Sequence, residues 1–180
     1  MGEKIMQTLH YIPELNTTAD IISLLSDIGP DKDVLFGEYG RLLPWVVQST
    51  DAMKGGNRFV EIILKNKNRD LVTSSLISAA ASGFQGALIA SGIFGKKTGM
   101  GKPVYDLDPS QTLMLAIALR KEGSLPANFR IGLRAPTGSG AAHERVRFFM
   151  ENGADFIAVT ESMPFPEFED KTVIIKEYKR

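Results

Sequence analysis

The stretch Ala81-Ser82-Gly83-Phe84-Gln85-Gly86-Ala87-Leu88-Ile89-Ala90 decides the fold, because it leads from a helix end through glycine into a continuous apolar run. Such a run is typical of a strand that is buried on both faces of a parallel sheet. Residues 152–159 repeat this order, with Asn152-Gly153 before Phe156-Ile157-Ala158-Val159. The repeat predicts βα units around a parallel sheet, with residues 87–91 and 155–160 as interior strands.

Working outward from these two units, the same pattern predicts strands at residues 33–37, 59–64 and 129–134, and a weaker one at 172–176. Helices are expected at residues 17–28, 41–53, 68–81, 109–121 and 141–151. A complete eight-stranded barrel needs at least about 200 residues, and the chain has 180. The predicted fold is therefore α/β, a partial or incomplete (β/α)8 TIM-type barrel of about five or six βα units. We expect one domain over residues 1–180.

Composition excludes several classes of function. The chain has 21 Lys and Arg against 21 Asp and Glu, which argues against nucleic-acid or membrane binding driven by bulk charge. It has no cysteine and only two histidines, so disulfides, thiolate nucleophiles and a metal site are not expected. No apolar run is long enough for a membrane span or a signal peptide, and a soluble cytoplasmic protein is the expectation.

Polar residues follow the predicted strands at their carboxyl ends, where parallel α/β folds bind ligands. They combine acids such as Glu38 and Glu161 with cations such as Lys65, Lys67 and Arg134. One interpretation is a site for an anionic or heteroaromatic ligand. The other is that chains simply become polar where strands end, and the residues alone favour neither.

Three stretches between Asn68 and about Val159 resemble the methylenetetrahydrofolate reductase family. They are Ser75 to Phe84 after Asn68-Arg69, the more specific Lys102-Pro103-Val104-Tyr105-Asp106-Leu107-Asp108-Pro109-Ser110-Gln111-Thr112-Leu113, and Arg130-Ile131-Gly132-Leu133 with Asn152 to Phe156. The resemblance implies a (β/α)8 flavin enzyme that reduces methylenetetrahydrofolate with NAD(P)H through FAD.

The resemblance also implies site residues. Those expected to bind the cofactor are Glu61, Ser91, Gly92, Tyr105 and Asp106, joined by the strand-end cation Arg134, and Thr160 is expected to bind the substrate. Asp108 is expected to cap a helix that starts at Pro109, whereas Tyr105 and Asp106 have no local role and are expected to contact a ligand.

Other family positions differ here. Ile93 replaces an acid after the fourth strand, Phe149 replaces a flavin-binding lysine, and the stretch with the catalytic Glu is absent, so the catalytic residues stay unknown.

The first functional hypothesis is a reductase-like protein of folate one-carbon metabolism that binds FAD and a folate or nucleotide-like molecule. If active, it would be an NAD(P)H-dependent flavin oxidoreductase, and whether it is an enzyme is left open. The alternatives are a non-catalytic partner or regulatory subunit, or a small-molecule binding protein. Because five or six units leave open sheet edges, we expect a homodimer or a partner chain that completes the barrel.

Overall fold

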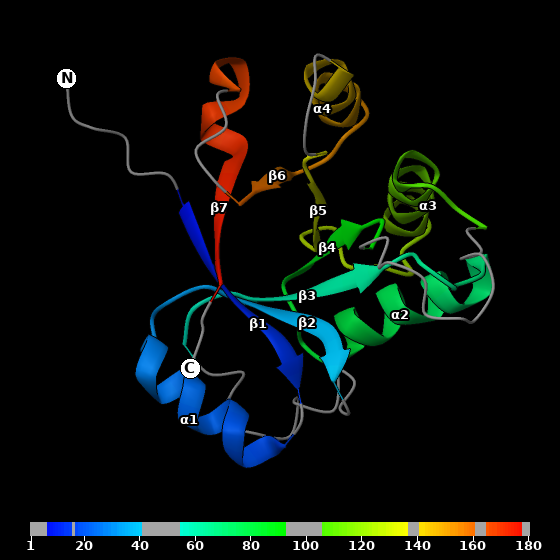
Figure 1. Cartoon of the computed structure of the whole chain (residues 1–180). Helices are drawn as coiled ribbons and strands as arrows, with labels where there is room; N and C mark the ends of the chain where they lie inside the picture. The colour runs from blue at the N-terminus through cyan, green and yellow to red at the C-terminus, as the bar shows by residue number, and fades with distance from the viewer. Residues whose placement is uncertain are drawn as a thin grey trace, which may run out of the picture.

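In the computed structural model, seven parallel strands form a closed barrel among the described residues (Figure 1). In chain order they are β1 (Gln7–Leu15), β2 (Val34–Gly40), β3 (Arg58–Ile63), β4 (Gly86–Ala90), β5 (Arg130–Arg134), β6 (Phe156–Val159) and β7 (Thr172–Glu177). Each strand pairs with its successor, and β7 pairs with β1 from Gln7↔Val173 to Tyr11↔Glu177. The structure describes residues 7–15, 17–40, 55–92, 106–136, 141–160 and 165–177.

The described helices are α1 (Thr18–Ile28), α2 (Arg69–Ala81), α3 (Pro109–Lys121) and α4 (Ala141–Glu151), with a short 3₁₀ helix, η3 (Pro166–Lys171), before β7. Three of them, α1, α2 and α3, begin where a polar side chain caps them, as the sequence predicts. Thr17 and Asn68 accept hydrogen bonds from backbone N–H groups in the first turns of α1 and α2. At α3, Asp108 and Gln111 form a reciprocal capping box ahead of Pro109, which confirms the predicted cap. None of the described helices is long and apolar enough to cross a membrane.

The TIM-type α/β fold is confirmed, but the prediction of five or six units with open edges is wrong, because the weak strand at 172–177 is real and β1 was missed. β1 was not predicted because it contains Pro13, and a proline within an apolar run argues against a strand. Here Pro13 lies at a register shift between Ile12 and Glu14, where a β-bulge tolerates a residue without an N–H. The predicted helix at residues 41–53 lies outside the described residues.

The barrel interior is filled toward the amino-terminal ends of the strands. A cluster drawn only from strands occupies it, formed by Leu9, Tyr11, Leu35, Phe59, Leu88, Phe156, Ala158, Val173 and Ile175. Arg130, at the start of β5, lies with its guanidinium carbon 5.4 Å from the ring centroid of Phe59 and 5.1 Å from that of Phe156. A Cβ at Gly132 would lie 2.2 Å from the Phe156 ring, so only glycine leaves room for that ring. Polar groups that could meet a ligand are therefore found at the other end.

Candidate functional site

Three side chains from alternate strands converge inside the barrel near the carboxyl ends of the strands. The hydroxyl of Tyr11 on β1 donates to Glu61 Oε2 on β3 at 2.5 Å. Arg134 Nη2, on β5, donates to Glu61 Oε1 at 2.7 Å. Glu61 lies two residues after the inward-facing Phe59, and Arg134 two residues after Gly132, so the strand period points both into the barrel. We call this group the Tyr11–Glu61–Arg134 cluster.

The cluster is buried at its carboxylate and partly open at its cation. The side chain of Glu61 is 3% exposed, whereas that of Arg134 is 31% exposed. The Arg134 guanidinium lies 5.4 Å from the centroid of the Tyr11 ring, which favours the cation electrostatically. Arg134 Nε is buried and has no hydrogen-bond partner among the described residues. Buried donors normally have an acceptor, so Arg134 keeps capacity to bind an anion.

A second polar group lies beside this cluster. Glu38, near the end of β2, forms an ion pair with Lys67, in the turn after β3. Glu38 Oε2 accepts a hydrogen bond from the backbone N–H of Ile63 at 2.8 Å, and Lys67 Nζ donates to the carbonyl oxygen of Ile63 at 2.6 Å. Both side chains are thus committed to one another and to the end of β3.

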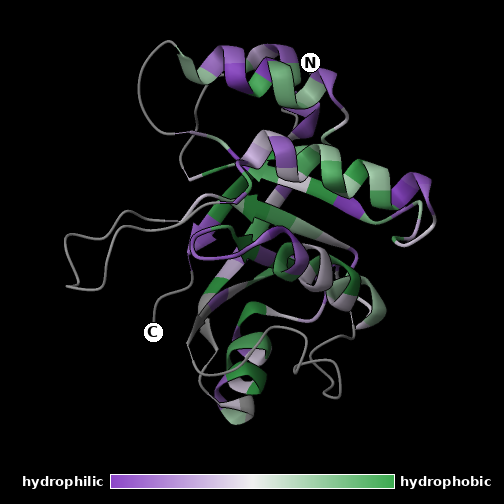
Figure 2. Cartoon of the chain, turned by 90° about the vertical axis from the view of Figure 1, so that its right-hand side faces the viewer, coloured by the Kyte–Doolittle hydropathy of each residue, from purple (hydrophilic) through white to green (hydrophobic). Residues whose placement is uncertain are grey.

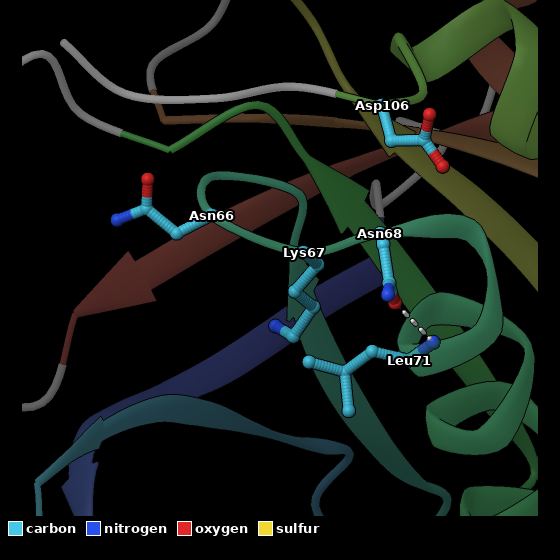
Figure 3. A pocket seen from close by; sticks show the side chains of 5 residues that line it. All are labelled: Asn66, Lys67, Asn68, Leu71 and Asp106. Atoms are coloured by element: carbon cyan, nitrogen blue, oxygen red, sulfur yellow. Dashed lines mark hydrogen bonds between the residues drawn. The ribbon is translucent and has the colours of Figure 1, made fainter.

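A shallow hollow of about 250 Å³ lies next to this turn, lined by Asn66, Lys67, Asn68, Leu71 and Asp106 (Figure 3). Two of its polar side chains, Asn68 and Asp106, bind the start of α2. Asn68 Oδ1 accepts from the N–H of Leu71 at 2.9 Å, and Asp106 Oδ2 accepts from the N–H of Arg69 at 2.7 Å. Asp106 therefore has a structural role that the sequence did not show.

The predicted site residues divide into two sets. Glu61 and Arg134 are brought together, and Tyr11, which was not predicted as a site residue, joins them because β1 closes the barrel. Ser91 and Thr160 are exposed where their strands end. A Cβ on Gly92 (φ +92°) would lie 2.9 Å from Ile63 Cγ2, so this glycine allows the chain to pass close to β3. Ligand contacts of Ser91, Gly92, Asp106 and Thr160 stay predictions, and Tyr105 lies outside the described residues.

No group of three or more His, Asp or Glu side chains placed to hold a metal ion occurs in the part of the chain that the structure describes. Cysteine, the other common ligand, is absent from the sequence.

Comparisons with known proteins identify the fold. No family model and no curated protein matches the sequence. Among solved structures, an oxaloacetate acetylhydrolase in complex with its product oxalate matches with a TM-score of 0.61 at 13% identity, over 93% of this chain and 75% of that one. A 2,3-dimethylmalate lyase of the PEP mutase/isocitrate lyase superfamily matches with a TM-score of 0.60 at 10% identity, over 94% and 76%. A phosphonopyruvate hydrolase matches with a TM-score of 0.59 at 12% identity, over 96% and 75%.

These neighbours overturn the resemblance to the methylenetetrahydrofolate reductase family, and the folate and FAD oxidoreductase assignments that it implied are wrong. The structure explains the error. The matching stretches contain Asn68, Asp108 and Gly153, which cap helices or turn the chain after them with a positive φ. Any parallel barrel needs such residues at those places. At 10–13% identity, the neighbours show that this chain shares the barrel fold of these three enzymes.

Proposed function

We propose that this chain is an enzyme that binds a small organic acid at the carboxyl ends of the barrel strands and acts on it as a lyase or hydrolase. The observation that carries this proposal is the Tyr11–Glu61–Arg134 cluster, which sets a partly open cation beside a buried carboxylate and a phenol. The neighbours' names support the substrate class. Oxaloacetate, 2,3-dimethylmalate and phosphonopyruvate are all small anions with a carboxylate next to an oxygen-bearing carbon.

Arg134 is the group that would hold the substrate carboxylate. A guanidinium presents several N–H donors in a planar fork that matches a carboxylate. One of these donors already serves Glu61, and the side chain as a whole is partly exposed. Binding there would place the reacting carbon next to the buried carboxylate.

Glu61 and Tyr11 would then move the proton. In a lyase reaction, a carboxylate takes the proton from the substrate hydroxyl, and the carbon–carbon bond breaks to leave a carbonyl and an enolate. The proton then returns to the enolate carbon, so no external oxidant or reductant is needed. The hydrogen bond between Tyr11 and Glu61 provides a path for that return.

The first experiment measures oxalate and oxaloacetate binding by calorimetry, with Arg134→Gln compared with Arg130→Gln. Both arginines lie on β5 and face the interior, but Arg130 lies at the filled end. Arg134→Gln should weaken binding about tenfold to a hundredfold, the range for a hydrogen bond between charged groups. Arg130→Gln should leave the affinity unchanged. An unmodified chain that binds neither anion, or equal losses in both variants, would refute the proposal.

We also propose that two copies of the chain associate through the outer face of α2 and α3, which lie side by side (Figure 1). Residues 71–81 and 109–119 of these helices include no charged side chain, although Ile77 is 38% and Met114 51% exposed. Figure 2 views this side and shows hydrophobic and intermediate colours along the middle of α3. Charge depletion and exposed Met are typical of interface cores.

Charged side chains lie at the two ends of this face. They are Asp70, Asp106, Asp108 and Arg69 where the helices begin, and Lys121 and Glu122 at the end of α3, where Arg120 is already paired with Asp155. A two-fold axis across the helices would bury the uncharged middle of one copy against that of the other. The closed barrel removes the reason to expect a partner that supplies strands, because β7 pairs with β1 and each described strand has a neighbour on both sides over part of its length.

A further inference from the structure

The barrel wall is incompletely hydrogen bonded next to Glu61. The ladder between β2 and β3 ends at Phe36↔Val60, although β3 continues to Ile63. On its other side, β3 stays paired with β4 as far as Ile63↔Ala90. The upper half of β2 instead follows β1 as far as Leu15↔Gly40. The end of β3, from Glu61 to Ile63, is therefore not paired with β2.

Side chains take the place of that missing ladder. Glu38 accepts from the N–H of Ile63, and Lys67 donates to its carbonyl oxygen, so both backbone groups of one residue are bound by a single ion pair. The side chain of Glu38 is 8% exposed and that of Lys67 is 14% exposed. Hydrogen bonds to ionised groups are stronger than those between neutral groups, and little water competes here.

The turn after β3 brings Lys67 back to this position. The N–H of Lys67 donates to the carbonyl oxygen of Leu64 at 3.1 Å. Asn66 makes the turn with a φ of +62°, a conformation that asparagine tolerates better than most residues. Asn68 then caps α2, which fixes the far side of the turn. The lysine is therefore held close to Ile63 before any ligand arrives.

We propose that Glu38 and Lys67 are positioning residues for Glu61. This inference rests on the proposed function, in which Glu61 moves a proton. By fixing Ile63, two residues further along the same strand, the ion pair holds the Glu61 carboxylate where Tyr11 and Arg134 reach it. Without it, the end of β3 would be free to separate from β2, and the Glu61 contacts would lengthen or open.

The chain offers a matched control at the opposite end of the barrel. Asp155 forms an ion pair with Arg120 and accepts from the N–H of Ile131 at 2.7 Å, while Arg120 donates to the carbonyl oxygen of Phe129 at 3.3 Å. This pair also fixes a strand through its backbone, but at the beginning of β5, far from Glu61 along the barrel. Asp155→Asn therefore removes the charge of a comparable carboxylate, as Glu38→Gln does, without touching the cluster.

The experiment compares Glu38→Gln, Lys67→Arg and Asp155→Asn with the unmodified chain. Two NMR readouts that need no ligand are followed, the hydrogen exchange of the Ile63 amide and the carboxyl carbon signal of Glu61, assigned with Glu61→Gln. In Glu38→Gln, the Ile63 N–H would donate to a neutral amide oxygen instead of an ionised carboxylate, and the ion pair with Lys67 would be lost. Ile63 exchange should therefore quicken about fivefold to tenfold, and the Glu61 signal should move. Lys67→Arg, which keeps a cationic donor, should retain both values. Asp155→Asn should quicken Ile131 exchange alone.

The outcomes separate this inference from the proposed function. If Glu38→Gln leaves the Ile63 exchange and the Glu61 signal unchanged, or if Asp155→Asn moves them equally, the positioning role is refuted. If Glu38→Gln does not fold, Lys67→Met gives the same comparison from the other partner. Absence of oxalate binding to the unmodified chain refutes the proposed function, while the two NMR readouts still decide whether the ion pair positions Glu61.

Discussion

At the scale of single residues, His10 couples protonation to folding. Its Nδ1 is buried without a hydrogen-bond partner among the described residues. Burial lowers the pKa of His10 below its ordinary value of 6.5, the nearby Lys176 and Lys32 lower it further, and Asp33 opposes them. The folded chain therefore holds His10 neutral at a pH where the unfolded chain already binds a proton. Stability is full above about pH 6.5 and falls as the pH decreases toward the lowered pKa.

We expect His10→Gln to make stability less dependent on pH. The melting temperature of the unmodified chain should fall from about pH 8 to about pH 5, and the variant should lose less over the same range, because the pKa difference at this position is gone. Thermal unfolding followed by circular dichroism measures both. His143→Gln, at an exposed position, is the control. An unchanged pH dependence in the His10 variant would show that other groups control it.

At the scale of elements, two aspartates stabilise the starts of α2 and α3, one within its own helix and the other across to a neighbouring helix. Asp108 caps α3 locally through Gln111, whereas Asp106 accepts from Arg69, at the start of α2. Asp108→Ala should cost about 1 kcal/mol and lower the melting temperature by about 2–4 °C. Asp106→Ala should lower it too, because the N–H of Arg69 loses its acceptor. Asp106→Asn, which keeps an acceptor oxygen, should restore most of it, and failure to do so would contradict this role for Asp106.

Elements whose signals are local could be predicted from the sequence. The capping residues Thr17, Asn68 and Asp108 predicted where three helices begin, and the apolar runs predicted β4 and β6. β1 could not be predicted because Pro13 argues against a strand unless the bulge is known. The same error left Tyr11 out of the predicted site. Arg134 was predicted from its place at the end of a strand, whereas Glu61 was predicted only through the family resemblance, which was wrong. That they meet depends on barrel closure, and the bond from Asp106 to Arg69 spans 37 residues, so neither was visible locally.

At the scale of the whole molecule, the uncharged face of α2 and α3 predicts a dimer. Met114→Lys should weaken association about tenfold or more, because a lysine buried at an interface loses hydration. Ile22→Lys, at a 50% exposed position on α1, is the matched control and should leave association unchanged. Light scattering after size exclusion measures the mass. An unmodified chain that stays monomeric at high concentration, or equal dissociation in both variants, would exclude this interface.

The filled end of the barrel has a kinetic consequence. The interior is closed near the amino-terminal ends of the strands by Arg130, Phe59 and Phe156. A small molecule therefore cannot pass through the barrel from one end to the other. A reaction that splits one substrate into two fragments must then release both fragments on the side from which the substrate entered. The fragment held deeper, against Glu61, departs last and competes with fresh substrate for the empty enzyme. The outer fragment departs first and inhibits without such competition, so product-inhibition patterns report the orientation in which the substrate lies.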